Sequence, residues 1–322
     1  LLACINIVDR LSKISELKNI GFTVDKEYGE IFQKCNQFLM EYNGSSIPTD
    51  MEQNEIKYEL PIFFIGDTIN KKSGGVESGF KLFPIGEGSY AQVFKYFDDF
   101  YDKYFVVKRA RTNLDAKELE RFYKEYEVMK SINSPYVLEV YRLDKNKNEY
   151  FMEFADFSLY DYILKNNQKL NFTIRRKLCL QIIRAFEVFD RIGVLHRDIS
   201  PKNVLLKKYQ DEVVVKIADF GLVKTVDSQL TSLETEVRGY FNDVSSLSTE
   251  GFKNYNKQYE YYALSKLIYF VLTGRYKNMN KFDFPKLKEF MEKGLNSNHN
   301  LRYKAIAELR DAFLEIQEEW KF

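Results

Sequence analysis

The stretch His196-Arg197-Asp198-Ile199-Ser200-Pro201-Lys202-Asn203 decides the fold of this 322-residue chain. Short apolar runs flank it, Gly193–Leu195 before and Val204–Leu206 after. Sixteen residues after Asn203 comes Asp219-Phe220-Gly221, which follows the β-branched run Val213–Ile217. Such a loop can offer one carboxylate to a hydroxyl, while an amide and a second carboxylate supply the oxygen ligands that hard cations prefer. The plainer interpretation is an Arg–Asp pair buried in a turn. The choice between the two interpretations depends on the rest of the chain.

The composition is that of a folded protein with a full hydrophobic core. Hydrophobic residues make up 45% of the chain, and its length suits one large domain or two ordinary ones. The net charge is +1 and the basic residues are spread out, which argues against a nucleic-acid or anionic-membrane surface. Cys4, Cys35 and Cys179 are unclustered, as is typical of reduced core thiols. With neither a membrane-spanning run nor a secretory signal visible after Leu1, we expect a cytoplasmic protein without nucleic-acid or membrane partners.

Residues 1–79 are predicted to form a separate N-terminal segment. Apolar residues at helical spacing predict one helix over residues 1–20 and a second over 25–42, which together make a helical hairpin. A polar connection leads to an edge strand over 58–65, and residues 71–79 indicate a linker or a hairpin loop. The hairpin either covers part of the next domain or docks a partner or a second copy of the chain, and the sequence leaves both open.

Residues 80–154 alternate strands with a single helix. A glycine-rich turn at 86–91 joins the first two strands, and such a turn lets backbone N–H groups approach phosphate oxygens closely. This signal is weak by itself, because many hairpins contain two glycines. The predicted strands are 80–85, 92–97, 104–108, 136–143 and 149–154, and the predicted helix is 115–132.

From residue 155 onward the pattern is mainly helical. Residues 222–250 interrupt it with a stretch rich in Ser, Thr and acidic residues that has no strong periodicity. A long irregular stretch inside a compact domain is usually functional. The predicted helices are 159–164, 171–191, 260–272, 282–293 and 301–322, and two short strands are predicted at 204–206 and 213–217.

In this order the two motifs resemble the catalytic core of eukaryotic-type protein kinases. The glycine turn, the strand that ends in Lys108 and the apolar helix after residue 260 fall where that family has its counterparts. The resemblance covers residues 80–322. It implies an α+β, two-lobed protein-kinase-like fold after the N-terminal hairpin, with an antiparallel-sheet N-lobe at 80–154 and a mainly helical C-lobe at 155–322. The chain is identified as a divergent, bacterial-type member of the serine/threonine kinase-like superfamily.

The resemblance implies that the γ-phosphoryl group of ATP is transferred to Ser or Thr hydroxyls of a protein substrate, with tyrosine left open as an acceptor. Asp198 would orient the hydroxyl and take its proton, and Asn203 and Asp219 would hold Mg²⁺. Serine/threonine kinases usually place a γ-phosphate-binding lysine where Ser200 stands here. Lys202, two places later, would reach that phosphate instead.

The resemblance also implies a binding site for ATP. Lys108 would contact the α- and β-phosphates and would be held by Glu125, the glutamate that matches the family position counted back from Pro135. The other ATP-binding residues would be Gly86, Gly88 and Ser89 over the phosphates and Val93, Val106, Met152, Glu153, Ala155 and Leu205 around the adenine. His196 and Phe220 resemble members of the apolar spine of the family, so we interpret His196 as structural.

Regulation is implied by an arginine next to the catalytic aspartate. Arg197 resembles the kinase arginine that receives a phosphate from the activation segment, since a bidentate fork suits that anion. We hypothesise autophosphorylation within residues 225–240. The candidate acceptors are Thr225, Ser228, Thr231, Ser232, Thr235 and Tyr240.

Three further departures from the family pattern stand out, beside Ser200. Ala91 replaces the third glycine of the turn, which predicts a stiffer loop. Glu260 stands where the family usually has aspartate, so the bonds that anchor the catalytic loop must shift. The usual Ala-Pro-Glu is absent, and either Asp243 or Glu250 could pair with Arg302.

Two other functions fit the same residues. One is a small-molecule phosphotransferase of kinase-like fold, although such enzymes generally lack the arginine before the catalytic aspartate and the hydroxyl-rich segment. The other is a pseudokinase or binding scaffold that works through residues 1–79. All of the core polar residues are present, which favours the active protein kinase.

Overall fold

The computed structural model places the chain in two compact units. Unit 1 comprises Leu1–Leu114 with Arg142–Phe154, and unit 2 comprises Asp115–Tyr141 with Ala155–Phe322. Among the described residues, no helix combines the length and apolarity needed to cross a bilayer. The structure describes residues 5–7, 10–11, 22–24, 26–40, 45–46, 48–49, 63–65, 68–73, 76–88, 90–222, 240–277, 279, 281–282 and 285–317.

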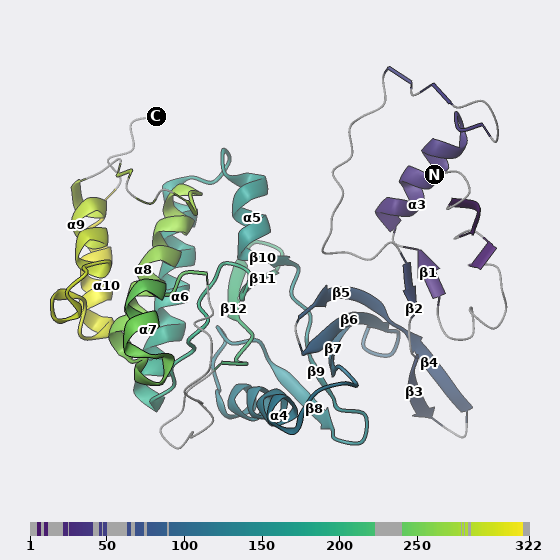
Figure 1. The fold of residues 1–322 in the computed structure, drawn as a ribbon, viewed down its shortest axis with the longest axis horizontal. Coiled ribbons are helices and arrows are strands. Elements are labelled where there is room, and N and C mark those ends of the chain that lie inside the picture. Colours follow the sequence, from purple (N-terminus) through teal and green to yellow (C-terminus); the bar gives the residue numbers. More distant parts are fainter. Residues whose placement is uncertain are drawn as a thin grey trace. The chain divides into compact units, whose positions relative to one another are not determined.

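A five-stranded antiparallel sheet carries the kinase-like part of unit 1 (Figure 1). Its strand order is β5-β6-β7-β9-β8, and Leu82, Phe94, Tyr96 and Val107 form the buried cluster against it. The strands are β5 (Phe83–Glu87), β6 (Ala91–Asp98), β7 (Lys103–Ala110), β8 (Val140–Asp144) and β9 (Glu149–Glu153).

Two predicted strands have different limits in the structure. The strand predicted over 80–85 is divided between β4 (Val76–Lys81) and β5. The strand pairing is interrupted at Leu82, whose side chain is buried in the core. The strand predicted over 136–143 begins only at Val140. Residues 136–138 instead bond to Ile217 within unit 2, since Ile217 N–H donates to the Tyr136 carbonyl and Leu138 N–H to the Ile217 carbonyl.

In its described residues the N-terminal segment holds two small two-stranded sheets and the helix α3 (Lys26–Asn36). β1 (Phe22–Val24) pairs with β2 (Phe63–Ile65), and β3 (Thr68–Ser73) pairs with β4, so residues 71–73 and 76–79 belong to paired antiparallel strands. Helix α3 is the second helix of the predicted hairpin. Only residues 5–7 and 10–11 of the first are described, and they are helical.

Unit 2 is mainly helical, and its long helices begin and end at the residues that favour caps. Helix α6 starts after Asn171, whose side chain accepts from Ile174 N–H, and stops at Gly193 in the left-handed region. Helix α8 likewise runs from the cap Asn256 to Gly274. The helices are α4 (Ala116–Ser131), α5 (Leu159–Asn166), α6 (Phe172–Ile192), α7 (Val244–Glu250), α8 (Lys257–Thr273), α9 (Pro285–Gly294) and α10 (Ile306–Leu314).

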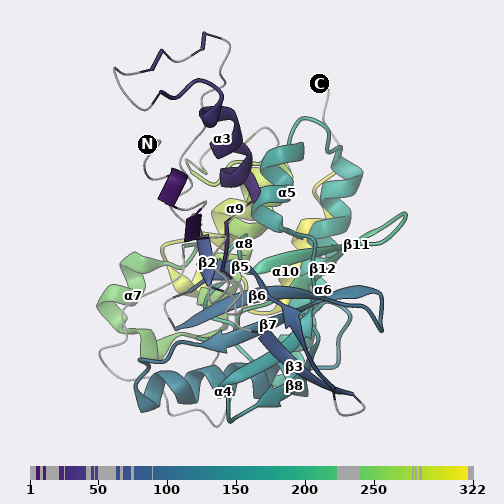
Figure 2. The ribbon, with the colours of Figure 1, turned by 90° about the vertical axis from the view of Figure 1, so that its right-hand side faces the viewer.

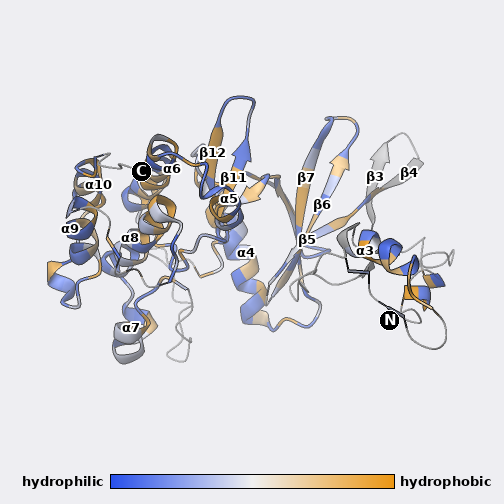
Figure 3. Ribbon diagram, turned by 90° about the horizontal axis from the view of Figure 1, so that it is seen from above, coloured by the Kyte–Doolittle hydropathy of each residue, from blue (hydrophilic) through white to orange (hydrophobic). Residues whose placement is uncertain are grey.

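Helix α8 forms the core of unit 2. It is buried on almost all sides and packs against α6 and α9, while α10 packs on α6 and α9. Helix α7 projects from this layer (Figures 2 and 3). Helix α6 carries hydrophobic residues on one face and hydrophilic residues on the other, as Figure 3 shows by colour. Of the three thiols, Cys35 and Cys179 are buried and free, and Cys4 lies outside the described residues.

Three short strands and two 3-10 turns complete unit 2. β10 (Phe157–Ser158), β11 (Val204–Lys208) and β12 (Val213–Ile217) form an antiparallel sheet in that order. The 3-10 turns are η1 (Phe252–Asn254) and η2 (His299–Leu301). The loop 196–203 therefore lies between the end of α6 and the start of β11, as the sequence predicts.

Candidate active site

Asp198 and Asn203 are brought together within the loop 196–203. The Asn203 side-chain amide donates to the Asp198 backbone carbonyl at 2.9 Å and to its carboxylate at 3.1 Å. The Asn203 carbonyl accepts from Ala218 N–H at 2.9 Å, which places Asp219 next to the same loop. Because the amide nitrogen faces Asp198, its oxygen is the atom left to ligate a cation. An amide oxygen and a carboxylate are ligands that suit Mg²⁺, so Asn203 and Asp219 fit the predicted metal.

His196 is a structural residue, as its sequence context predicts. It is only 1% exposed, and its ring lies 4.8 Å from the Phe220 ring, centroid to centroid. Asp198 N–H donates to its Nδ1 at 3.3 Å, so the proton is on Nε2, which donates to the Ala218 carbonyl at 3.0 Å. Met129 and Val140 are also buried. The ring thus joins Asp198 to the segment that carries Asp219.

Arg197 and Asp219 have left-handed backbone conformations, with φ of 68° and 62°. Non-glycine residues rarely adopt this region, and each such residue costs on the order of 1–3 kcal/mol. Hydrogen bonds around the loop offset this conformational energy; for example, the Arg197 carbonyl accepts from the Asn242 side chain at 2.8 Å. Strain at these two positions, one before Asp198 and one at the second carboxylate, is typical of a functional loop.

Glu260 anchors the loop from helix α8. Its carboxylate accepts from His196 N–H at 2.6 Å, from Arg197 N–H at 3.2 Å and from the Tyr255 hydroxyl at 2.8 Å. Burial raises the pKa of Glu260 above its ordinary value, and His196 together with these hydrogen bonds opposes that rise. The longer side chain still reaches both loop amides, and it gains Tyr255 as a third donor.

Changing Glu260 to glutamine is expected to destabilise the protein by about 1–3 kcal/mol, because the new amide N–H₂ must face a buried donor. The same change loosens the loop, so turnover should fall as well. Urea unfolding followed by tryptophan fluorescence measures the first effect. Glu187→Gln is the matched control, since Glu187 pairs with Arg310 at a partly exposed site and should cost less than about 1 kcal/mol. Equal stabilities of the two variants would contradict the anchoring role.

Asp243, and not Glu250, is the partner of Arg302. The Arg302 guanidinium donates to the Asp243 carboxylate, and both side chains are almost fully buried. Glu250 instead accepts from the Tyr259 hydroxyl and lies 3.5 Å from His299 Nδ1. Asp243 also caps α7 through Ser246 N–H at 3.2 Å. This ion pair therefore holds the N-terminus of α7, close to the point where the described chain resumes at residue 240.

The glycine turn of unit 1 joins β5 to β6. Gly86 lies opposite Val93, and Gly88 N–H donates to the Ala91 carbonyl at 2.8 Å. A Cβ added at either glycine would meet nothing closer than 3.7 Å, and neither glycine has positive φ. The turn itself therefore does not require glycine, which favours a role in close approach of a ligand. Ser89, a further predicted phosphate contact, lies outside the described residues.

The remaining predicted ATP-binding residues fall on strands or on helix α4, except Ala155, which lies between β9 and β10. In unit 1, Lys108 lies on β7 opposite Val93 and is 8% exposed, and its Nζ lies 5.3 Å from the centre of the Tyr90 ring. Val106 and Met152 face each other across β7 and β9. In unit 2, Glu125 is buried on α4. The other predicted positions are Glu153 at the end of β9 in unit 1, and Ala155 and Leu205 in unit 2.

A family model described as the protein kinase domain matches residues 81–304. The chain belongs to the protein kinase family. The match starts one residue after the predicted limit of the resemblance and includes every predicted site residue of this kinase. It also confirms the predicted α+β fold of an antiparallel-sheet lobe and a helical lobe.

Serine/threonine kinases are among the relatives of this kinase. NUAK family SNF1-like kinase 1 of Mus musculus is 33% identical over 143 residues, which cover 43% of the chain and 21% of the relative. Serine/threonine-protein kinase RAD53 of Saccharomyces cerevisiae is 28% identical over 203 residues, 59% of the chain and 24% of the relative. Probable serine/threonine-protein kinase PknB of Lactococcus lactis is 27% identical over 198 residues, 59% of the chain and 31% of the relative. The chain thus spans no more than about a third of these proteins.

Arg197 of this kinase has contacts that the sequence did not predict. Its guanidinium is buried, donates to the Phe252 carbonyl at 2.7 Å and lies 4.1 Å from the centre of the Phe252 ring. Burial lowers the pKa of Arg197 to about 10, although Tyr255 and Glu260 oppose this. A phosphate from residues 225–240 would have to compete with Phe252 for this side chain. Residues 223–239 lie outside the described residues, and Tyr240 is exposed.

Sequence reasoning missed three residues that hold the loop. Asn242, Phe252 and Tyr255 come from the irregular segment before α8, and each contacts Arg197 or Glu260. A possible signal was the aromatic spacing of Phe252, Tyr255 and Tyr259, which form one buried cluster with Leu247.

Proposed function

We propose that this protein is an ATP-dependent serine/threonine protein kinase. The observation that carries the proposal is the Asn203 amide, whose nitrogen donates to the Asp198 carbonyl and carboxylate and so leaves the amide oxygen available to ligate a cation. Two of the relatives named above, RAD53 and PknB, are serine/threonine-protein kinases by name, which supports the same acceptor class here. The predicted alternatives, a small-molecule phosphotransferase and a scaffold working through residues 1–79, are not favoured by the family match.

The proposed reaction gives each of these side chains a role. Asp198 orients the acceptor hydroxyl and takes its proton as the oxygen attacks the γ-phosphorus, while the bond from that phosphorus to the leaving oxygen of ADP breaks. Mg²⁺, when held by Asn203 and Asp219, neutralises charge on the phosphates. Lys108, with Glu125, is assigned to the α- and β-phosphates. Gly86, Gly88 and Ser89 are assigned to the phosphates, and Val93, Val106, Met152, Glu153, Ala155 and Leu205 to the adenine.

Transfer of label from [γ-³²P]ATP tests this function. The protein is incubated with Mg²⁺ and generic protein substrates, and in parallel with small alcohols such as choline. Label in protein, recovered on serine or threonine after acid hydrolysis, supports the proposal. Label in the small alcohols alone would favour the phosphotransferase, and label in neither, with ATP bound, would favour the scaffold.

Lys202→Ala is expected to lower kcat about tenfold while changing the KM for ATP less than about twofold. The reason is that Lys202 is proposed to contact the γ-phosphoryl group in the transition state of its transfer. Lys202 is exposed and its Nζ lies 5.8 Å from the centre of the Tyr160 ring. Lys207→Ala is the matched control, since Lys207 lies equally far from the Tyr209 ring. Steady-state kinetics distinguish the two variants, and unchanged kinetics in Lys202→Ala would remove it from the mechanism.

Autophosphorylation is expected within residues 225–240. Mass spectrometry after incubation with Mg-ATP should find phosphate on one or more hydroxyls of this stretch, and Asp198→Asn should carry none. An active enzyme without phosphate there would contradict the hypothesis. A cytoplasmic location, and self-association or partner docking through residues 1–79, stay as predictions beside it.

A further inference from the structure

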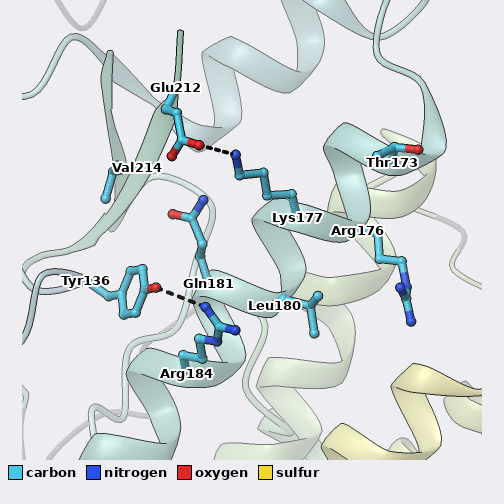
Figure 4. Close-up of a pocket in the computed structure, with 9 residues that line it drawn as sticks. All are labelled: Tyr136, Thr173, Arg176, Lys177, Leu180, Gln181, Arg184, Glu212 and Val214. Carbon is cyan, nitrogen blue, oxygen red and sulfur yellow. Dashed lines mark hydrogen bonds and ion pairs between the residues drawn. The ribbon is translucent and has the colours of Figure 1, made fainter. Parts of the chain in front are cut away.

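A pocket of about 390 Å³ lies in unit 2 (Figure 4). One wall is helix α6 and the other is the β11–β12 hairpin, with one side chain from the segment before β8. None of the residues assigned to ATP, Mg²⁺ or the acceptor hydroxyl lines it. The lining residues are Tyr136, Thr173, Arg176, Lys177, Leu180, Gln181, Arg184, Glu212 and Val214.

The walls of this pocket are fixed in place. The Gln181 amide bridges α6 to β12, since its nitrogen donates to the Val213 carbonyl at 3.0 Å and its oxygen accepts from Val215 N–H at 2.8 Å. Lys177 crosses to Glu212 at the rim at 2.8 Å. A prebuilt site costs less to occupy than one that must order on binding.

The pocket carries an excess of positive charge. Three cations line it, and its one carboxylate, Glu212, is already paired with Lys177. In the part of the chain that the structure describes, neither Arg176 nor Arg184 has a carboxylate partner. Arg176 Nε is buried and meets no acceptor among the described residues, and Arg184 contacts only the neutral hydroxyl of Tyr136, at 3.3 Å. Two guanidiniums are thus available to an incoming anion.

The two arginines have a definite spacing with an apolar residue midway. Arg176, Leu180 and Arg184 are four residues apart on one face of α6, and Figure 4 shows Leu180 between the two guanidiniums. At a rise of about 1.5 Å per residue, the arginine Cα atoms are about 12 Å apart along the helix. An extended peptide advances about 3.3 Å per residue, so its residues i and i+4 match this separation.

We propose that this pocket docks an extended acidic peptide segment of a partner protein. Carboxylates at positions i and i+4 bind Arg184 and Arg176, and an apolar side chain at i+2 packs on Leu180 and Val214. Guanidinium groups suit carboxylates because they donate in a planar fork. A nucleic acid is the weaker occupant, since five of the nine lining residues are uncharged and a carboxylate lies at the rim.

Fluorescence polarisation with the intact protein tests the proposal. The probe is a fluorescein-labelled peptide with the core Glu-Ala-Leu-Ala-Glu, and the comparison peptides replace both glutamates by glutamine or the leucine by serine. Binding should weaken about tenfold for each comparison peptide and also as salt is raised. Arg176→Gln/Arg184→Gln should weaken the probe by a similar factor. Lys286→Gln/Lys288→Gln removes the same charge from α9 and should change the affinity less than about twofold.

Exchanging the charges of the protein and the peptide shows whether a loss of binding comes from the lost ion pair or from unfolding of the variant. Arg184→Glu should lose the glutamate probe and should bind a peptide in which one terminal glutamate is lysine. Equal binding of the probe to the arginine double variant and to the wild type would overturn the proposal. Tighter binding of a short DNA duplex than of the probe would also overturn it. The measurement requires no phosphoryl transfer, so it is independent of the proposed activity.

Discussion

Asp198→Asn is expected to lower kcat by about 10²–10⁴-fold, the range that a positioned general base contributes. An asparagine amide can still accept the hydrogen bond that Asn203 donates to this side chain, so the loop geometry is kept. It cannot take the proton of the acceptor hydroxyl. The affinity for ATP should therefore stay within about twofold of the wild type, because no phosphate or adenine contact is assigned to Asp198.

Two measurements on the same protein separate these effects. Single-turnover transfer from [γ-³²P]ATP reports the chemical step, and a fluorescent ATP analogue reports nucleotide binding. Asp211→Asn is the matched control, since Asp211 is exposed in the β11–β12 turn and should leave both values unchanged. A variant of Asp198 that keeps wild-type turnover would mean that another group takes the proton.

The loop could be predicted because its chemistry restricts its residues. Asp198, Asn203 and Asp219 are the residue types that the proposed proton transfer and metal binding require, so their spacing could be recognised although the local structure is irregular. The helices α6 and α8 could be predicted for a different reason. Their apolar spacing and their asparagine and glycine caps are local signals, and the structure places both helices within a few residues of the predicted limits.

Other features of the fold and of the site could not be predicted, because they depend on contacts between residues far apart in the chain. The strand pattern around residue 82 continued smoothly, but the buried Leu82 ends β4 and starts a new strand. Tyr136 has strand-like neighbours, yet its backbone pairs with Ile217. Nothing local marks Phe252 as the residue beneath the Arg197 guanidinium. Likewise, Asp243 and Glu250 are both acidic residues that could pair with Arg302 by sequence position, and only the fold shows that Asp243 does so.

Arg302→Met is expected to destabilise the protein by about 3–5 kcal/mol, because it leaves the Asp243 carboxylate buried without its charged partner. Arg302 also donates to the Asn296 carbonyl at 2.7 Å and lies 4.5 Å from the centre of the Tyr262 ring. Urea unfolding gives the free energy. Arg310→Met removes an arginine whose partners, Glu187 and Asp311, are at the surface, so it should cost less than about 1 kcal/mol.

The double variant Asp243→Asn/Arg302→Met tests whether the two groups act as a pair. Its loss should be smaller than the sum of the single losses by about 1–3 kcal/mol, because each single change includes the cost of stranding the other group. Additive losses would mean that Arg302 acts through Asn296 and Tyr262 alone.

The same pair predicts how stability depends on pH. Burial alone would raise the pKa of Asp243, but hydrogen bonds from Arg302 and Ser246 outweigh it and hold the pKa below its ordinary value of 3.8. The unfolded chain therefore binds this proton first as the pH falls, so the contribution of Asp243 is present above pH 3.8 and is lost as the pH drops through the folded-state pKa. Between pH 5 and about pH 3 the free energy of unfolding should fall more steeply in the wild type than in Asp243→Asn. Parallel curves would show that the Asp243 carboxylate gains nothing from Arg302, and the buried pair would then be a feature of packing rather than of charge.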